Sequence, residues 1–164
     1  MTRITEQIER LERRVKSAAE SAGRDLASVT IIAVTKRQPA DAIVEARQAG
    51  LRHFGANYLQ EALEQIPVAG PDAVWHFIGP VQANKTRAIA GNFDWVHTVT
   101  SRRIAERLSA QRPVTRGPLQ ICIQLRPHGS SARHGVEETG LAALVRDIVA
   151  QPNLRLRGLM MMPL

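Results

Sequence analysis

The sequence has a single cysteine, Cys122, among its 164 residues. One cysteine excludes a disulfide framework, and it forms a zinc site only with several ligands of other types. No stretch approaches the roughly 20 consecutive apolar residues that a membrane span requires. Residues 1–16 are charged along their whole length and lack the apolar core of a secretory signal. We therefore expect a soluble, cytoplasmic protein.

Aromatic residues are also scarce, at 4%, whereas 44% of the chain is hydrophobic and 23% is charged. This length and apolar fraction suit one compact domain spanning 1–164, and they exclude a disordered or collagen-like chain. The sequence lacks an aromatic-rich basic face of the kind that stacks on single-stranded nucleic acid. It also lacks the glycine-rich phosphate-binding motifs and the nucleophile-elbow motif.

Lysine is the third scarcity. The only lysines are Lys16, Lys36 and Lys85, so 19 of the 22 basic residues are arginine, and the net charge is +7. A guanidinium stays charged, whereas an ammonium group can lose its proton and react, so the few lysines deserve scrutiny for an amine function. Composition alone favours a simple arginine bias. The position of each lysine in the fold therefore has to decide whether it has an amine function. The basic excess suits anionic partners, phosphorylated small molecules and nucleic acids alike.

The hydrophobic pattern predicts a leading amphipathic helix over 4–19, followed by alternating strands and helices. Strands are expected at 29–34, 53–55, 74–78, 95–99, 119–125 and 154–161. Helices are expected at 40–49, 58–66, 84–90, 102–111 (with Ser101 as N-cap) and 137–150. The run at 29–34 is apolar and largely β-branched, which is typical of a strand buried on both faces.

This alternation predicts the α/β class, with parallel strands joined by crossover helices. Periodicity does not distinguish an open sheet from a closed barrel. Length favours the open sheet, because a (β/α)8 barrel typically has about 250 residues and eight strands. In both architectures ligands bind at the carboxyl ends of the strands, where the irregular segment 126–135 is also expected.

Two residues after predicted strands are candidates for ligand binding. Lys36 follows the first strand, beside Arg37 and an apolar wall; burial and a neighbouring cation both favour the neutral amine that attacks an aldehyde. The simpler interpretation is a solvated lysine at a strand end. Asn57 follows Gly55 after the second strand and either contacts a ligand through its amide or acts only as a helix N-cap.

The remaining candidates have simpler explanations. His76 alternates with Trp75 and Phe77 in an aromatic stretch that we expect to anchor the core, so a buried, hydrogen-bonded histidine is favoured over a catalytic one. His97 and His134 have no second metal ligand at helical or hairpin spacing, and we assign no metal. Cys122 is expected to be a small buried apolar residue.

Taken together, the segments resemble the pyridoxal phosphate homeostasis proteins, a family related in fold to the N-terminal barrel of alanine racemase. The matching stretches run in order along nearly the whole chain. They are AVTK at 33–36 with Pro39-Ala40, RHFG at 52–55 with Asn57-Tyr58 and Gln60-Glu61, WHFIG at 75–79 with Gln82 and Asn84-Lys85, and LRLRGLM at 154–160.

The resemblance implies an α/β fold of the (β/α)8 barrel type, here incomplete with about six strands. It implies that Lys36 holds pyridoxal 5′-phosphate as a Schiff base and that Asn57 lines the cofactor pocket. It further implies a non-catalytic protein of cofactor homeostasis, whose possible partners are the apo-enzymes that receive the cofactor.

Three departures from the family pattern modify these expectations. Ala56 stands where the family usually has glutamate, and Arg133 stands where a lysine is usual, within an atypical segment 127–134. The chain also ends at Leu164, before the two last strands, whose loops bind the cofactor phosphate in the family. We therefore expect reduced cofactor affinity and unpaired edges on the first and sixth strands that favour self-association.

Two alternatives remain open. A racemase-like enzyme would need a second acid or base to reprotonate the substrate carbanion, and Tyr58, the only tyrosine, belongs to a helix-opening motif. Nucleic-acid association would be driven by the arginine excess, but many arginines alternate with glutamates in helices, as in 9–14. Such a face is ordinarily solvated and self-paired. We therefore expect no specific nucleic-acid partner.

Overall fold

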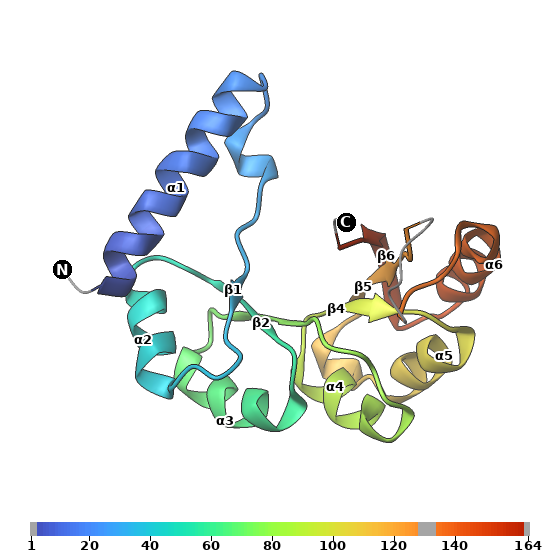
Figure 1. The fold of residues 1–164 in the computed structure, drawn as a ribbon. Helices are drawn as coiled ribbons and strands as arrows, with labels where there is room; N and C mark the ends of the chain where they lie inside the picture. Colours follow the sequence, from blue (N-terminus) through green and yellow to red (C-terminus); the bar gives the residue numbers. More distant parts are fainter. Residues whose placement is uncertain (1–2, 128–133, 163–164) are drawn as a thin grey trace.

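A computed structural model describes residues 3–127 and 134–162 (Figure 1). The helices are α1 (Arg3–Ser21), α2 (Ala40–Gln48), α3 (Leu59–Ala69), α4 (Thr86–Asn92), α5 (Arg102–Gln111) and α6 (Glu138–Val149). The strands are β1 (Ala33–Val34), β2 (His53–Ala56), β3 (Val74–Phe77), β4 (Trp95–Val99), β5 (Leu119–Gln124) and β6 (Leu154–Met160). The leading helix and the predicted alternation are confirmed, as is the cap at Ser101, whose hydroxyl accepts from the Ile104 amide.

The six strands form one parallel sheet in the order β1-β2-β3-β4-β5-β6. Helices α2 to α5 follow one another along a single side of this sheet (Figure 1). A doubly wound sheet reverses direction at a switch point and carries helices on both faces, whereas each crossover here adds the next strand in the same direction. The sheet is therefore the arc of a (β/α) barrel, and the open-sheet expectation from length is wrong. Within the described residues the arc does not close.

The first strand is shorter than predicted. Only Ala33 and Val34 pair with β2, at Phe54 and Gly55, and 29–32 form no strand. The expected burial on both faces is also wrong, because Val34 is 48% exposed. The reason is positional: β1 lies at one end of the sheet order, so it has a single neighbour and, among the described residues, little covers its inner face.

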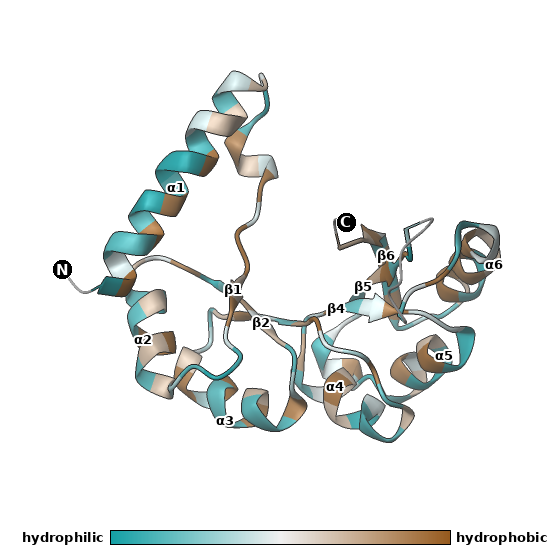
Figure 2. Cartoon of the chain, in the orientation of Figure 1, coloured by the Kyte–Doolittle hydropathy of each residue, from teal (hydrophilic) through white to brown (hydrophobic). Residues whose placement is uncertain are grey.

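The hydrophobic core lies between the sheet and the helices. Phe54, Trp75, Phe77 and Phe93 meet there, with ring centroids 5.6 Å apart for Phe54–Trp75 and 5.2 Å apart for Phe77–Phe93. The helices turn hydrophobic residues toward the sheet and polar residues outward (Figure 2). The aromatic stretch between 54 and 77 thus anchors the core, as predicted. No helix of the described part is long and apolar enough to cross a bilayer.

At the carboxyl edge of the sheet, the loops after β2 and β3 pack with no room for a side chain. A Cβ added at Gly79 would lie 2.0 Å from the carbonyl oxygen of Asn57. On its other side, the Gly79 carbonyl accepts a hydrogen bond from the hydroxyl of Thr98 on β4, at 2.5 Å. Glycine at 79 therefore sets how closely the Asn57 loop approaches its neighbour.

We expect Gly79→Ala to destabilise the protein by about 1–3 kcal/mol, because the new methyl group overlaps main-chain atoms that have little freedom to move. Gly91→Ala is the matched control, since a Cβ there meets nothing within 4 Å and Gly91 lies in α4. Replacing a helical glycine raises stability by about 0.5–1 kcal/mol. Denaturant unfolding measures both changes. Equal effects of the two substitutions would contradict the close packing at Gly79.

Candidate functional site at the carboxyl edge of the sheet

Lys36 lies in the turn that follows β1, and it is exposed. The turn is joined to the end of β2, because the Thr35 amide donates to the Gly55 carbonyl at 2.9 Å. The residue before Lys36, Thr35, is only 3% exposed. The burial that the sequence suggested around Lys36 is therefore found one residue earlier. Arg37, the neighbouring cation, is exposed as well.

Asn57 follows β2 at the same edge and is half-buried. Its interpretation as a helix N-cap is wrong: Tyr58 occupies that position of α3, and no side chain caps the helix there. The side-chain amide of Asn57 makes no hydrogen bond to other described residues, so its donor and acceptor groups are available for a ligand. Parallel pairing of β1 with β2 brings the ends of the two strands, and with them Lys36 and Asn57, to one edge of the sheet.

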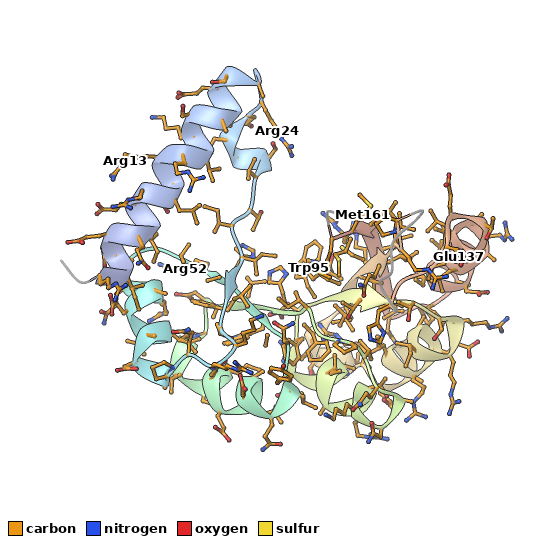
Figure 3. All side chains as sticks on the ribbon, viewed as in Figure 1. Arg13, Arg24, Arg52, Trp95, Glu137 and Met161 are labelled. Carbon is orange, nitrogen blue, oxygen red and sulfur yellow. The ribbon has the colours of Figure 1, made fainter. Side chains whose placement is uncertain are left out.

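The inner face of the sheet carries a row of three hydrogen-bonded histidines. His53 Nδ1 lies 2.9 Å from His76 Nε2, and His76 Nδ1 lies 2.8 Å from His97 Nε2. Trp95, on the open side of the sheet (Figure 3), stacks on His76 with centroids 5.4 Å apart, and the Arg157 guanidinium lies 5.7 Å from its ring. The interpretation of His76 as a buried, satisfied histidine is confirmed.

The three histidines are disfavoured as cations. Burial, followed by the neighbouring imidazoles of His97 and His53, lowers the pKa of His76 to about 3. Burial also lowers the pKa of His53 and the pKa of His97. A neutral imidazole has one donor and one acceptor nitrogen, so the proton position on His76 dictates the tautomers of both neighbours.

The partners of His76 were not predicted from the sequence. A usable signal exists, because His53, His76 and His97 are separated by 23 and 21 residues, each about one strand-plus-helix unit.

Cys122 is buried as expected, and burial raises the pKa of its thiol. In the described ranges, no cluster of three or more histidine, cysteine, aspartate or glutamate side chains is arranged to hold a metal ion. Arg133 lies outside the described residues.

A groove of about 680 Å³ lies beside α1, lined by residues that include Glu12, Leu26, Ile31 and His53. His53 begins β2, so this groove opens at the amino-terminal edge of the sheet. It includes neither Lys36 nor Asn57. Since ligands of such folds bind at the carboxyl edge, the groove is not the candidate site.

The arc of parallel strands, with an exposed lysine after β1, defines a class of barrel proteins. The family model of the alanine racemase N-terminal domain matches residues 7–163, and the chain belongs to this family. Within it, the chain belongs with the pyridoxal phosphate homeostasis proteins. The protein of that name from Pseudomonas aeruginosa is 49% identical over 164 residues, which cover 99% of this chain and 71% of the relative. The one from Escherichia coli K12 is 40% identical over 169 residues, with the same coverage of 99% and 71%.

Solved structures agree with this assignment. PipY of Synechococcus elongatus, in a structure with PLP bound, matches with a TM-score of 0.77 and 34% identity over 91% of this chain and 70% of PipY. Alanine racemase from Corynebacterium glutamicum matches with a TM-score of 0.65 and 17% identity over 96% of this chain and 44% of the racemase. The second match shows the shared fold alone.

The histidine row predicts a loss of stability in mild acid. The unfolded chain binds a proton at His76 below about pH 6.5, whereas the folded chain resists protonation down to a pKa of about 3. The free energy of unfolding should therefore fall as the pH drops below about 6.5, by up to about 1.4 kcal/mol per pH unit for each such proton. Denaturant unfolding between about pH 7.5 and about pH 4.5 measures this slope.

His76→Gln should flatten the slope, because the substituted side chain does not titrate. His134→Gln is the matched control, since His134 is exposed, and it should keep the wild-type slope. Identical slopes in the wild type and His76→Gln would contradict the role given to the buried imidazole.

Proposed function

We propose that this chain binds pyridoxal 5′-phosphate and acts in the homeostasis of that cofactor, with Lys36 as the covalent anchor and Asn57 as a contact in the pocket. The membership of the homeostasis-protein family at up to 49% identity carries the proposal. PipY, which has a solved structure with PLP bound, supports it independently. The placement of Lys36 and Asn57 at one edge of the sheet fits the same function.

The residues at this edge suit the aldehyde end of the cofactor. Bound pyridoxal phosphate would supply an electrophilic aldehyde. The Lys36 amine would hold this aldehyde carbon reversibly as a Schiff base, which would form with loss of water and be reversed by hydrolysis. An exposed lysine serves reversible binding well, because the carrier has to take up the cofactor and give it to apo-enzymes. The half-buried Asn57 amide, without a partner in the described chain, offers both a donor and an acceptor.

The proposed role is non-catalytic. A racemase-like reaction needs a second acid or base beside the substrate carbon. Tyr58 is 53% exposed at the start of α3, Cys122 is buried with a raised pKa, and His76 is held in the histidine row. None of the three suits that task. Exchange of the α-hydrogen of amino acids for deuterium, catalysed by the loaded protein, would favour the enzyme instead.

The other expectations are secondary parts of the proposal. We also propose a cytoplasmic location, in keeping with a role in cofactor homeostasis. Nucleic-acid binding receives less support than cofactor binding, because arginines such as Arg13 and Arg102 form ion pairs with glutamates one turn away on the same helix.

Lys36→Ala should abolish the covalent adduct with pyridoxal phosphate, because the other two lysines, Lys16 and Lys85, lie in α1 and after β3. The measurement is imine absorbance, followed by borohydride reduction and peptide mass spectrometry. Lys85→Ala is the control and should retain the adduct on Lys36. A reducible adduct that persists in Lys36→Ala at the wild-type level would refute the assignment.

Asn57→Ala should weaken binding of the cofactor by about tenfold, which corresponds to the loss of one hydrogen bond of about 1.4 kcal/mol. Equilibrium titration monitored by absorbance measures the change. Asn92→Ala is a suitable comparison, since Asn92 is also half-buried but ends α4, before β4 begins. Equal affinities for Asn57→Ala and the wild type would remove Asn57 from the site.

A further inference from the structure

A buried glutamine from α3 binds both ends of the turn that carries Lys36. Gln65 is only 6% exposed. Its Nε2 donates to the carbonyl oxygens of Thr35 and Gln38, at 3.2 and 3.0 Å, and its Oε1 accepts from the Thr35 hydroxyl at 2.8 Å. The two carbonyls flank Lys36 and Arg37. One side chain therefore spans the turn from beneath.

The same helix supports the centre of the turn. Arg37 has a φ of 58°, in the left-handed region, which is an unfavourable conformation for a residue with a side chain. The Arg37 amide donates to Glu61 Oε2 at 3.1 Å, and the Gln38 amide closes the turn on the Thr35 carbonyl at 3.0 Å. The contacts from Glu61 and Gln65 offset the cost of this backbone conformation.

A glutamine at 65 is an unusual choice for stability alone. A buried amide has to be fully hydrogen-bonded, whereas an apolar side chain would pack α3 on the sheet without that demand. Within the described part of the chain, every hydrogen bond that the Gln65 side chain makes goes to residues 35 and 38. The bonds thus define the conformation of one exposed turn, and the residue exposed by that turn is the proposed anchor.

We propose that Gln65, assisted by Glu61, is a positioning residue for Lys36: it holds the 35–38 turn in the conformation in which the lysine amine meets the cofactor aldehyde. This inference rests on the proposed function. It concerns the covalent step and not the contacts that hold the rest of the cofactor. Replacing Gln65 should therefore slow the formation of the adduct and leave noncovalent binding of the cofactor unchanged.

The test compares Gln65→Leu with Gln111→Leu. Gln111 is a matched control, because its Oε1 accepts from the Thr86 hydroxyl at 2.7 Å, a second threonine–glutamine pair remote from Lys36 in the α4–α5 region. Stopped-flow absorbance with pyridoxal phosphate gives the rate of adduct formation at Lys36. Titration with pyridoxine 5′-phosphate, an alcohol that forms no imine, gives the noncovalent affinity.

We expect Gln65→Leu to slow adduct formation by about tenfold or more, since a small displacement of a reacting group has effects of that size. Its affinity for the alcohol should stay within about twofold of the wild type, as should both values for Gln111→Leu. A wild-type rate in Gln65→Leu, or equal losses of rate and affinity, would overturn the inference. A wild-type protein that forms no adduct on Lys36 would overturn the proposed function and the inference with it.

A second pair of variants guards against misfolding of Gln65→Leu. Glu61→Ala removes the acceptor of the Arg37 amide from a side chain that is only half-buried, and it should slow adduct formation several-fold. Glu61→Gln keeps an oxygen acceptor at the same place and should restore the rate. If Glu61→Ala and Glu61→Gln react equally fast, the support from Glu61 is not needed and that part of the inference fails.

Discussion

Parallel pairing of the strands in their chain order is the constraint on which the rest of this structure depends. Each crossover adds the next strand on the same side of the previous one. All carboxyl ends of the strands therefore lie at one edge of the sheet, and the crossover helices lie along one of its faces. The hydrogen bond from the Thr35 amide to the Gly55 carbonyl joins the turn that carries Lys36 to the end of β2. The placement of Lys36 and Asn57 at one edge of the sheet follows from the parallel pairing.

The two faces of the sheet carry different kinds of side chain. The face toward the helices is filled with aromatic and branched side chains, as in any barrel wall. The inner face carries polar groups, and the histidine row satisfies them without a charge: each imidazole finds its partner on the neighbouring strand. A charged group in the same place would need a counter-ion, and the lowered pKa of His76 expresses that cost.

The proposed anchor combines an exposed side chain with a rigid base. An amine that exchanges a cofactor with other proteins has to be reachable, yet a long flexible side chain on a loose loop would meet the aldehyde rarely. Different residues meet these two requirements. Lys36 is exposed and reachable, whereas Thr35 and Gln65 beneath it are buried and hold the turn. Helix α3 begins two residues after Asn57 and bonds to the Lys36 turn through Glu61 and Gln65.

The sequence by itself determined the α/β class, the order of the elements and the positions of Lys36 and Asn57 at strand ends, because periodicity and turn residues are local signals. It also carried the family resemblance, through motifs such as WHFIG at 75–79. Periodicity and length did not identify the barrel arc, which the family resemblance implied and the strand order confirmed. Only the tertiary structure decided that β1 is two residues long and exposed, and that Gln65 reaches back across 30 residues to Thr35. These features depend on which strands pair and which helix lies beneath which turn, and such contacts between distant residues leave no periodic trace in the chain.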